Sequence, residues 1–208
     1  MPYKGKLKGL YVITDDKLTP DDTIYTQVED ALKGGASIVQ LRDKKNSDEI
    51  VKQKAIKLQQ LCKEYDAFFI LNDKIDLACE LQCDGLHIGK SDHDRFEYIR
   101  ENFKGIIGVS CYGDVELAKK FETMGADYVA FGSFFASPTK PNSNIVPLEV
   151  LTQAKKELNI PICAIGGINS ENLIDVLDHN PDMVSVISDI WRNENVQNQS
   201  NFYANQFY

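Results

Sequence analysis

The chain has 208 residues, of which 43% are hydrophobic, and it carries a formal net charge of −8 at pH 7. This length and apolar content suffice for one well-packed domain, so we expect a single domain over residues 1–208. The negative charge argues against nucleic acid as a partner, since a phosphate backbone requires a basic surface. Without a signal-peptide pattern or an apolar run near the roughly 20 residues that span a bilayer, we expect a cytoplasmic protein with no membrane partner.

Short apolar runs of strand length recur along the chain. They cover residues 9–13, 37–41, 67–71, 85–88, 106–109, 128–131, 162–165 and 184–187. Between most of them, apolar residues follow the 3.6-residue period of a helix, at 23–33, 47–65, 76–81, 94–103, 115–124, 148–158 and 171–177. Strand–helix alternation is typical of a parallel sheet, and eight strands are the number that a closed barrel needs. The sequence therefore predicts an α/β fold, a single (β/α)₈ TIM barrel with parallel strands.

Two segments stand outside this alternation. Residues 133–147 contain three prolines and little periodicity, which predicts a long loop over the carboxyl ends of the strands. Residues 193–208 are rich in Asn and Gln, and we expect them to form a last helix or a frayed tail. We assign this tail no function.

The second predicted strand directs polar side chains toward the barrel interior. Successive side chains of a strand point to opposite faces, so Gln40, Arg42 and Lys44 share one face, while Val39 and Leu41 pack on helices. An unpaired guanidinium inside a barrel would be costly, so Arg42 requires an anionic ligand or a carboxylate partner. The alternative to ligand binding is a structural ion pair, for example with Asp73.

Carboxylates follow the third and fourth predicted strands. Asn72 and Asp73 end the third strand, and Asp92 follows the fourth by a few residues. Neighbouring carboxylates at strand ends suit Mg²⁺, which takes oxygen ligands and completes its shell with water and substrate phosphates. Either Asp alone would be interpreted as a helix cap, but the pair beside Arg42 and Lys44 favours the metal.

Two histidines lie close to these carboxylates. His87 has the parity of the barrel interior, and we interpret it as a hydrogen-bonded structural residue rather than a base. His93 stands between two aspartates, and we expect it to be exposed. Neither belongs to the predicted catalytic set.

The remaining strand ends carry groups that suit phosphate. Hydroxyl and ammonium groups donate several hydrogen bonds to phosphate oxygens. Backbone amides after the seventh and eighth strands of such barrels often bind a phosphate. The residues concerned are Ser110, Ser137, Thr139, Lys140, Gly166, Gly167, Ile187 and Ser188. The sequence thus predicts that the ligands are phosphorylated small molecules.

Taken in order, the strand-end motifs resemble those of the thiamine phosphate synthase family. The motifs are LYVITD at 10–15, QLRDK at 40–44, LND at 71–73, DGLHIG at 84–89 with Asp92, GVS at 108–110, SPTK at 137–140 and AIGGI at 164–168. The resemblance covers about residues 9–190, and its specificity lies in the ordered combination. Two positions depart from the family pattern: Lys90 replaces a glutamine and Pro147 replaces a glycine.

The resemblance implies an enzyme that couples hydroxymethylpyrimidine pyrophosphate with hydroxyethylthiazole phosphate, with Mg²⁺ as cofactor. It implies that Asp73 and Asp92 bind the metal and that Gln40 contacts the pyrimidine. The implied pyrophosphate contacts are Arg42, Lys44, Asn72, Ser110 and Lys140, of which Arg42, Lys44 and Lys140 are the expected catalytic residues. The implied contacts to the thiazole phosphate are Ser137, Thr139, Gly167, Ile187 and Ser188.

Two alternative functions stay open at this point. A related thiazole tautomerase lacks the metal carboxylate and has a histidine shortly after the serine of the fifth strand, where this chain has Tyr112. A non-catalytic barrel that binds thiamine-pathway ligands or regulates the pathway has no need of the combined cations and carboxylates. Both comparisons favour the synthase. The sequence is compatible with a homo-oligomer.

Overall fold

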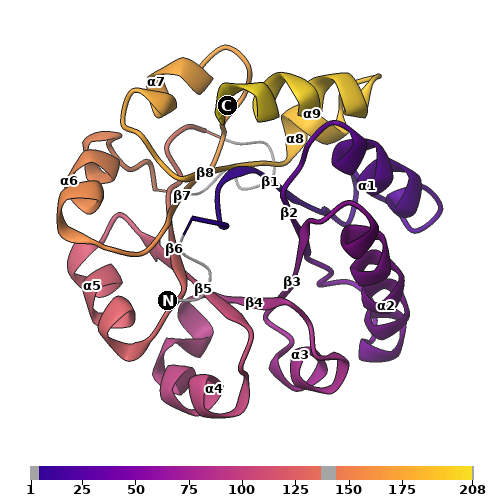
Figure 1. The fold of residues 1–208 in the computed structure, drawn as a ribbon, viewed down its shortest axis with the longest axis horizontal. Helices are drawn as coiled ribbons and strands as arrows, with labels where there is room; N and C mark the ends of the chain where they lie inside the picture. Colours follow the sequence, from indigo (N-terminus) through magenta and orange to yellow (C-terminus); the bar gives the residue numbers. More distant parts are fainter. Residues whose placement is uncertain (1–4, 137–143, 208) are drawn as a thin grey trace.

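The protein is a closed barrel of parallel strands surrounded by helices (Figure 1). The computed structural model describes residues 5–136 and 144–207. The eight strands follow one another around the barrel in chain order, and the pairing of β1 with β8 closes it. The predicted (β/α)₈ architecture is therefore confirmed.

Each strand overlaps the apolar run that predicted it. The strands are β1 Gly9–Ile13, β2 Ile38–Leu41, β3 Phe68–Asn72, β4 Gly85–Ile88, β5 Ile106–Tyr112, β6 Tyr128–Phe131, β7 Ile162–Ile165 and β8 Met183–Val186. The largest difference is at β5, which continues to Tyr112. A register shift against β6 between Ser110 and Tyr112 keeps this extension paired.

The helices also follow the predicted segments closely. They are α1 Ile24–Lys33, α2 Asp48–Glu64, α3 Ile75–Leu81, α4 Phe96–Asn102, α5 Val115–Met124, α6 Glu149–Glu157, α7 Leu173–Leu177, α8 Ser188–Trp191 and α9 Val196–Ala204, with 3₁₀ turns η1 Lys90–Arg95 and η2 Asn205–Phe207. The segment expected as one helix at 94–103 is the end of η1 followed by α4. Within the described ranges, no helix has the length and apolar character needed to cross a membrane.

The Asn/Gln-rich segment forms helix α9, which packs against α1, α8 and β1 (Figure 1). The contact with α1 is close at Gly34, where an added Cβ would lie 2.3 Å from the carbonyl oxygen of Gln197. The segment for which a last helix or a frayed tail was expected is helical at residues 196–204.

The alternation of side chains along the strands divides the core into two layers. Val39 and Leu41 belong to the outer layer between barrel and helices. The inner layer fills the barrel and includes Leu7, Tyr11, Ile38, Ile70, Ile106, Tyr128 and Met183. The sorting of β2 into two faces is therefore confirmed.

Gly108 on β5 makes room for an aromatic ring inside the barrel. A Cβ at Gly108 would lie 1.9 Å from Cζ of Tyr128, a distance that no pair of non-bonded carbons tolerates. Gly108 is paired in register with His87 on one side and with Tyr128 on the other. The glycine therefore leaves room for the Tyr128 ring inside the barrel, where the Tyr128 hydroxyl contacts Tyr11 and His87.

Candidate active site

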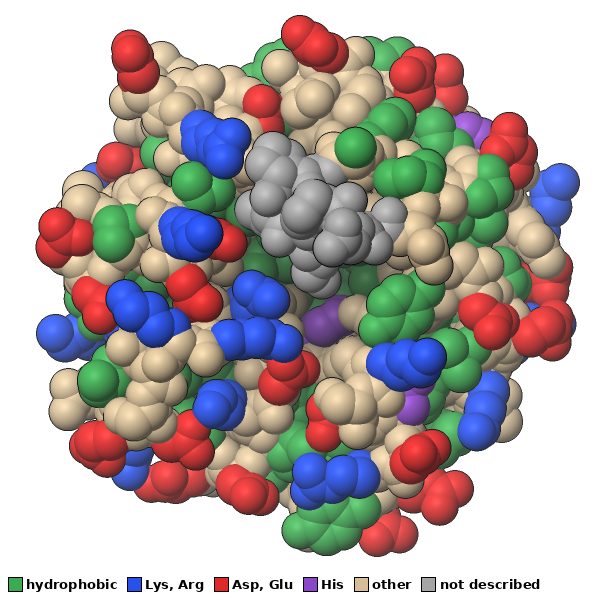
Figure 2. Space-filling view, turned by 180° about the vertical axis from the view of Figure 1, so that it is seen from behind, with side chains coloured by type: hydrophobic (Ala, Val, Ile, Leu, Met, Phe, Trp, Pro, Cys, Tyr) green, Lys and Arg blue, Asp and Glu red, His purple; other side chains and the backbone are tan. Residues whose placement is uncertain are grey.

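A cavity of about 540 Å³ lies at the carboxyl ends of the strands. Figure 2 shows this face hollowed near its centre, with a histidine in the hollow and Lys and Arg side chains gathered on one side of it. The ends of all eight strands contribute to the lining. The predicted residues in the lining are Gln40, Arg42, Asn72, Ser110, Gly167, Ile187 and Ser188. The prediction that these motifs, far apart in the sequence, meet at the carboxyl ends of the strands is confirmed.

The six other predicted site residues fall into two groups. Lys44, Asp73 and Asp92 lie outside the residues that line the cavity. Ser137, Thr139 and Lys140 lie outside the described residues, so their predicted roles stay predictions.

The end of β2 presents an amide and a guanidinium to the cavity. Gln40 is only 2% exposed, and its Nε2 donates to the hydroxyl of Tyr11 at 2.7 Å. The backbone of Arg42 is held by Thr14, whose Oγ1 accepts from the Arg42 amide at 2.9 Å. Within residues 5–136 and 144–207, no carboxylate forms an ion pair with Arg42, and Asp73 pairs with Lys44 instead. The geometry favours the ligand-binding interpretation of Arg42 over the structural ion pair.

A buried ion pair lies directly behind the loop that carries Arg42 and Lys44. The Lys54 ammonium on α2 lies 2.6 Å from Oδ2 of Asp43 and 2.6 Å from Oδ1 of the more exposed Asp21. Asn46 donates to Asp43 through its backbone and its side chain. Burial opposes ionisation of Asp43, but the hydrogen bonds from Lys54 and Asn46 outweigh it and lower the pKa to about 2. The Asp43 carboxylate is therefore charged, and its bonds to Lys54 and Asn46 fix the conformation of this loop.

Asp73 and Asp92, the predicted metal ligands, follow the neighbouring strands β3 and β4. Asp73 has a left-handed backbone with φ of 62°, and its carboxylate lies 3.3 Å from Nζ of Lys44. The Asp92 carboxylate lies 3.6 Å from the Arg95 guanidinium and accepts a hydrogen bond from Ser91. Among the described residues, no three His, Cys, Asp or Glu side chains are grouped as a complete metal cage. Both residues carry carboxylates, the kind of oxygen donor that suits an ion sharing its shell with phosphate and water.

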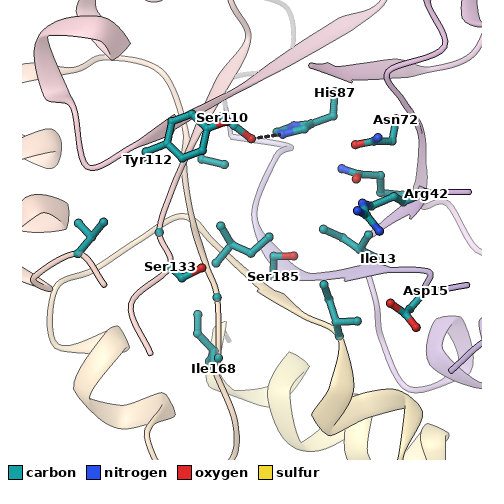
Figure 3. A pocket seen from close by; sticks show the side chains of 18 of the residues that line it. Ile13, Asp15, Arg42, Asn72, His87, Ser110, Tyr112, Ser133, Ile168 and Ser185 are labelled. Carbon is teal, nitrogen blue, oxygen red and sulfur yellow. Dashed lines mark hydrogen bonds between the residues drawn. The ribbon is translucent and has the colours of Figure 1, made fainter. Parts of the chain in front are cut away.

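A chain of hydrogen bonds crosses the barrel beneath the cavity. The Tyr11 hydroxyl lies 2.8 Å from the Tyr128 hydroxyl, which lies 2.8 Å from Nδ1 of His87. Nε2 of His87 lies 2.8 Å from Oγ of Ser110, the contact drawn in Figure 3. With the Gln40–Tyr11 bond, the chain joins two predicted substrate contacts on opposite sides of the barrel. His87 is hydrogen-bonded, as expected, and it also lines the cavity.

The predicted exposure of His93 is wrong. Its ring packs edge-on against Phe121 with centroids 4.7 Å apart, and its Nε2 lies 3.1 Å from the carbonyl oxygen of Ser110. Burial lowers the pKa of His93, and the hydrogen bond to Ser110 only partly offsets this effect. The reason for the error is the 3₁₀ turn η1, which directs the His93 side chain toward Phe121 of α5, although the adjacent Asp94 is exposed.

The side of the cavity formed by β5 to β8 is less charged. In Figure 3, Tyr112, Ser133 and Ile168 face Arg42 and Asn72 across the cavity. Tyr112 is 46% exposed and has φ of 59°, an uncommon value for a bulky residue that accompanies the register shift of β5. Tyr112 lies three residues beyond the predicted strand at 106–109, and the sequence singled it out only as the residue that replaces a tautomerase histidine.

The glycine pair after β7 brings two loops into close contact on this side. Gly167 has φ of 70°, and a Cβ there would lie 2.5 Å from the carbonyl oxygen of Phe135. The backbone of Gly166 accepts a hydrogen bond from the Phe135 amide at 2.9 Å. Nearby, the buried hydroxyl of Ser185 on β8 lines the cavity and has no hydrogen-bond partner among the described residues. Sequence reasoning missed Ser185 because it lies within an apolar run.

A parallel barrel whose eight strand ends surround one cavity is the arrangement of a TIM-barrel enzyme. The profile of the thiamine monophosphate synthase family matches residues 10–190 of the chain. The chain belongs to this family of enzymes, as the ordered motifs predicted.

Individual relatives agree with this assignment. The chain is 43% identical over 188 residues to a thiamine-phosphate synthase of Wolinella succinogenes, covering 89% of this chain and 86% of that one. It is 43% identical over 187 residues to a thiamine-phosphate synthase of Picrophilus torridus, covering 89% and 90%. The structure of thiamine phosphate pyrophosphorylase from Pyrococcus furiosus matches with a TM-score of 0.85 and 35% identity over 98% of this chain and 96% of that one. A 3-hexulose-6-phosphate synthase, 13% identical with a TM-score of 0.68, shares the fold alone.

Proposed function

We propose that the protein couples hydroxymethylpyrimidine pyrophosphate with hydroxyethylthiazole phosphate to give thiamine phosphate and pyrophosphate. Membership of the thiamine monophosphate synthase family supports the reaction class. The observation that carries the proposal is the division of the cavity into two sides. Gln40, Arg42 and Asn72 supply amides and a cation on one side, and the other offers glycine amides among apolar groups.

The reaction proceeds by departure of pyrophosphate before capture by the thiazole. The bond between the methylene carbon and the pyrophosphate oxygen breaks, and both electrons leave with pyrophosphate. The electron-rich aminopyrimidine stabilises the resulting cation, and the lone pair of the thiazole nitrogen then forms the new carbon–nitrogen bond. No proton is transferred and no protein nucleophile is needed, so the enzyme holds the partners in line and stabilises the leaving charge.

Arg42 is the principal cation for the leaving pyrophosphate in this proposal. Its guanidinium lines the cavity, and its planar fork of donors matches two phosphate oxygens at once. Asn72 and Ser110 add hydrogen bonds from β3 and β5. Lys44 and Lys140 complete the set as predicted catalytic residues.

We assign the cofactor Mg²⁺ to Asp73 and Asp92. Two carboxylates after adjacent strands fit an ion that binds few protein groups and several phosphate or water oxygens. Lys44 and Arg95 balance the charge of these carboxylates when no ion is bound. When bound, the ion supplies positive charge that stabilises the departing pyrophosphate.

The thiazole phosphate occupies the end of the cavity near β7 and β8. Gly167, Ile187 and Ser188 line this end, and barrels of this type often bind phosphate through the loops after their last two strands. Ser137 and Thr139 complete the predicted contacts. The neighbouring apolar residues Val146 and Ile168 suit a thiazole ring.

One assay tests the proposed function. The purified protein is incubated with both substrates, with and without Mg²⁺, and thiamine phosphate and pyrophosphate are quantified. We expect the two products in a one-to-one ratio and dependence on Mg²⁺. Isomerisation of the thiazole without coupling would identify a tautomerase, and binding of both substrates without product would identify a non-catalytic barrel.

A further inference from the structure

The hydrogen-bond chain beneath the cavity has a donor–acceptor direction. Its members are Gln40, Tyr11, Tyr128, His87 and Ser110, joined by contacts of 2.7 to 2.8 Å. Burial raises the pKa of both tyrosines well above the usual range, so each hydroxyl keeps its single hydrogen. Each hydroxyl can therefore donate once, and the direction of one bond determines the next.

From Gln40 onward, each group donates a hydrogen bond to the next group along the chain, and the last acceptor is Ser110. The Gln40 Nε2 donates to the Tyr11 hydroxyl, so Tyr11 uses its own hydrogen for Tyr128. Tyr128 then donates to Nδ1 of His87, because Nδ1 is the remaining acceptor in the chain for its one hydrogen once Tyr11 donates to Tyr128. A neutral imidazole that accepts at Nδ1 carries its hydrogen on Nε2, and this hydrogen bonds to Oγ of Ser110.

The same direction follows from the other end of the chain. A pyrophosphate oxygen can only accept hydrogen bonds, so Ser110 must direct its hydroxyl hydrogen into the cavity to bind one. Oγ of Ser110 must then accept from Nε2 of His87. The amide of Gln40 and the requirement of an anionic ligand at Ser110 therefore give the same donor–acceptor direction for every hydrogen bond of the chain.

This arrangement determines which side-chain atom of Gln40 is available to the ligand. Its Nε2 donates to Tyr11, and its side-chain oxygen Oε1 has no hydrogen-bond partner within the described ranges, although the residue lines the cavity. A carbonyl oxygen accepts a hydrogen bond from an amino group and repels another carbonyl oxygen.

We propose that the buried Tyr11–Tyr128–His87 relay fixes the orientation of the Gln40 amide and thereby makes the cavity select a heterocycle with an amino group opposite Gln40. The selection rests on the proposed function, since the ligand there is the aminopyrimidine. Tyr11, Tyr128 and His87 are positioning residues, which determine which atoms Gln40 and Ser110 present.

The first test determines the tautomer of His87 without any substrate. Imidazole ¹⁵N chemical shifts of the full chain at neutral pH distinguish a protonated Nε2 from a protonated Nδ1. The signals are assigned with His93→Gln and His179→Gln variants, which leave His87 in place. We expect His87 as the Nε2–H tautomer in the wild type. A predominant Nδ1–H tautomer would reverse the relay and overturn the proposal.

The second test measures substrate selection. Coupling is compared for the natural aminopyrimidine pyrophosphate and for its analogue with an oxo group in place of the amino group. We expect the wild type to prefer the amino substrate by roughly a thousandfold or more in kcat/KM. In Tyr11→Phe the Gln40 amide loses its partner and can turn, so the preference should fall by about tenfold or more. Tyr203→Phe removes a hydroxyl from a buried tyrosine of α9 outside the site and should leave the preference unchanged.

The outcomes separate this inference from the proposed function. An unchanged preference in Tyr11→Phe, with altered overall activity, would show that the relay does not orient Gln40 and would overturn the inference alone. Absence of coupling with the natural substrate in the wild type would overturn the proposed function. The tautomer of His87 would then still decide the direction of the relay.

Discussion

The ammonium of Lys54 lies 2.6 Å from the carboxylate of Asp43, and both groups are buried behind the loop that carries Arg42. Neither residue lines the main cavity. The pair joins helix α2 to the end of β2, so it holds in place the backbone from which the Arg42 guanidinium extends.

Substitution of Lys54 by methionine should destabilise the protein strongly. Lys54→Met leaves Asp43 charged and buried without its main partner, so the free energy of unfolding should fall by about 3 kcal/mol. Urea denaturation followed by circular dichroism measures this change. Lys57→Met, an exposed position one turn away on the same helix, should change stability by less than about 0.5 kcal/mol. Equal effects of both substitutions would mean that the ion pair contributes no more than a surface lysine.

Asp43 should make the stability sensitive to acid. Its pKa in the folded protein is about 2, below the value of about 3.9 for an unfolded chain, so its charged form favours folding. This contribution is complete above pH 4 and is lost as the pH falls from about 4 toward 2. Urea midpoints at pH 5, 4 and 3 should fall less steeply for Asp43→Asn than for the wild type. Parallel profiles would contradict the assigned pKa.

The metal assignment predicts a specific loss in Asp92→Asn. The amide keeps the shape of the side chain and removes its charge, so turnover should fall by roughly a hundredfold and the response to added Mg²⁺ should weaken. Asp94→Asn, an exposed neighbour in η1, is the matched control and should retain activity and metal dependence. Unchanged activity and Mg²⁺ dependence in Asp92→Asn would remove Asp92 from the metal site.

Arg42→Lys tests whether the cation binds the leaving group through its planar fork. Lysine keeps the charge but offers no parallel pair of donors, so kcat/KM should fall by tenfold or more. Lys140→Ala is measured beside it, because Lys140 is the other predicted catalytic cation whose removal should impair turnover. Near-wild-type kinetics of both variants would show that the leaving group is bound elsewhere.

Gly108→Ala should disturb the centre of the barrel. The added methyl group would lie 1.9 Å from the Tyr128 ring, so the ring must move or the strands must separate. We expect a loss of about 1–3 kcal/mol in stability together with reduced activity. Gly89→Ala provides the control, since a Cβ at Gly89 meets no atom within 4 Å. Wild-type stability of Gly108→Ala would show that the barrel accommodates the methyl group freely.

The barrel and the lining residues at its strand ends were accessible from the sequence because both depend on local patterns. The alternation of Gln40 with Val39 and Leu41 places Gln40 inside without knowledge of its neighbours. A parallel barrel then brings the strand ends together, so Arg42, Asn72 and Ser110 meet although they come from different strands.

Contacts that depend on closure of the barrel or on side-chain direction were not accessible in this way. Tyr11 and Tyr128 are 117 positions apart and looked like members of apolar runs, although their hydroxyls meet inside the barrel. The ion pair of Lys54 could have been predicted, because Lys54 lies on the apolar face of α2 and a buried lysine requires a carboxylate partner. Asp43, eleven positions earlier, has no predicted ligand role and is that partner. The direction of His93 depends on a 3₁₀ turn, whose side chains do not follow the helical period.

The closure of β1 against β8 also constrains how the chain can fold during synthesis. Strand β1 emerges from the ribosome first, but its second neighbour ends at residue 186 and helix α9, which covers α1, ends at residue 204. Until then, one edge of β1 and part of the apolar face of α1 have no native partner, and such edges readily pair with other chains. The nascent protein therefore cannot close its barrel before strand β8 has been translated.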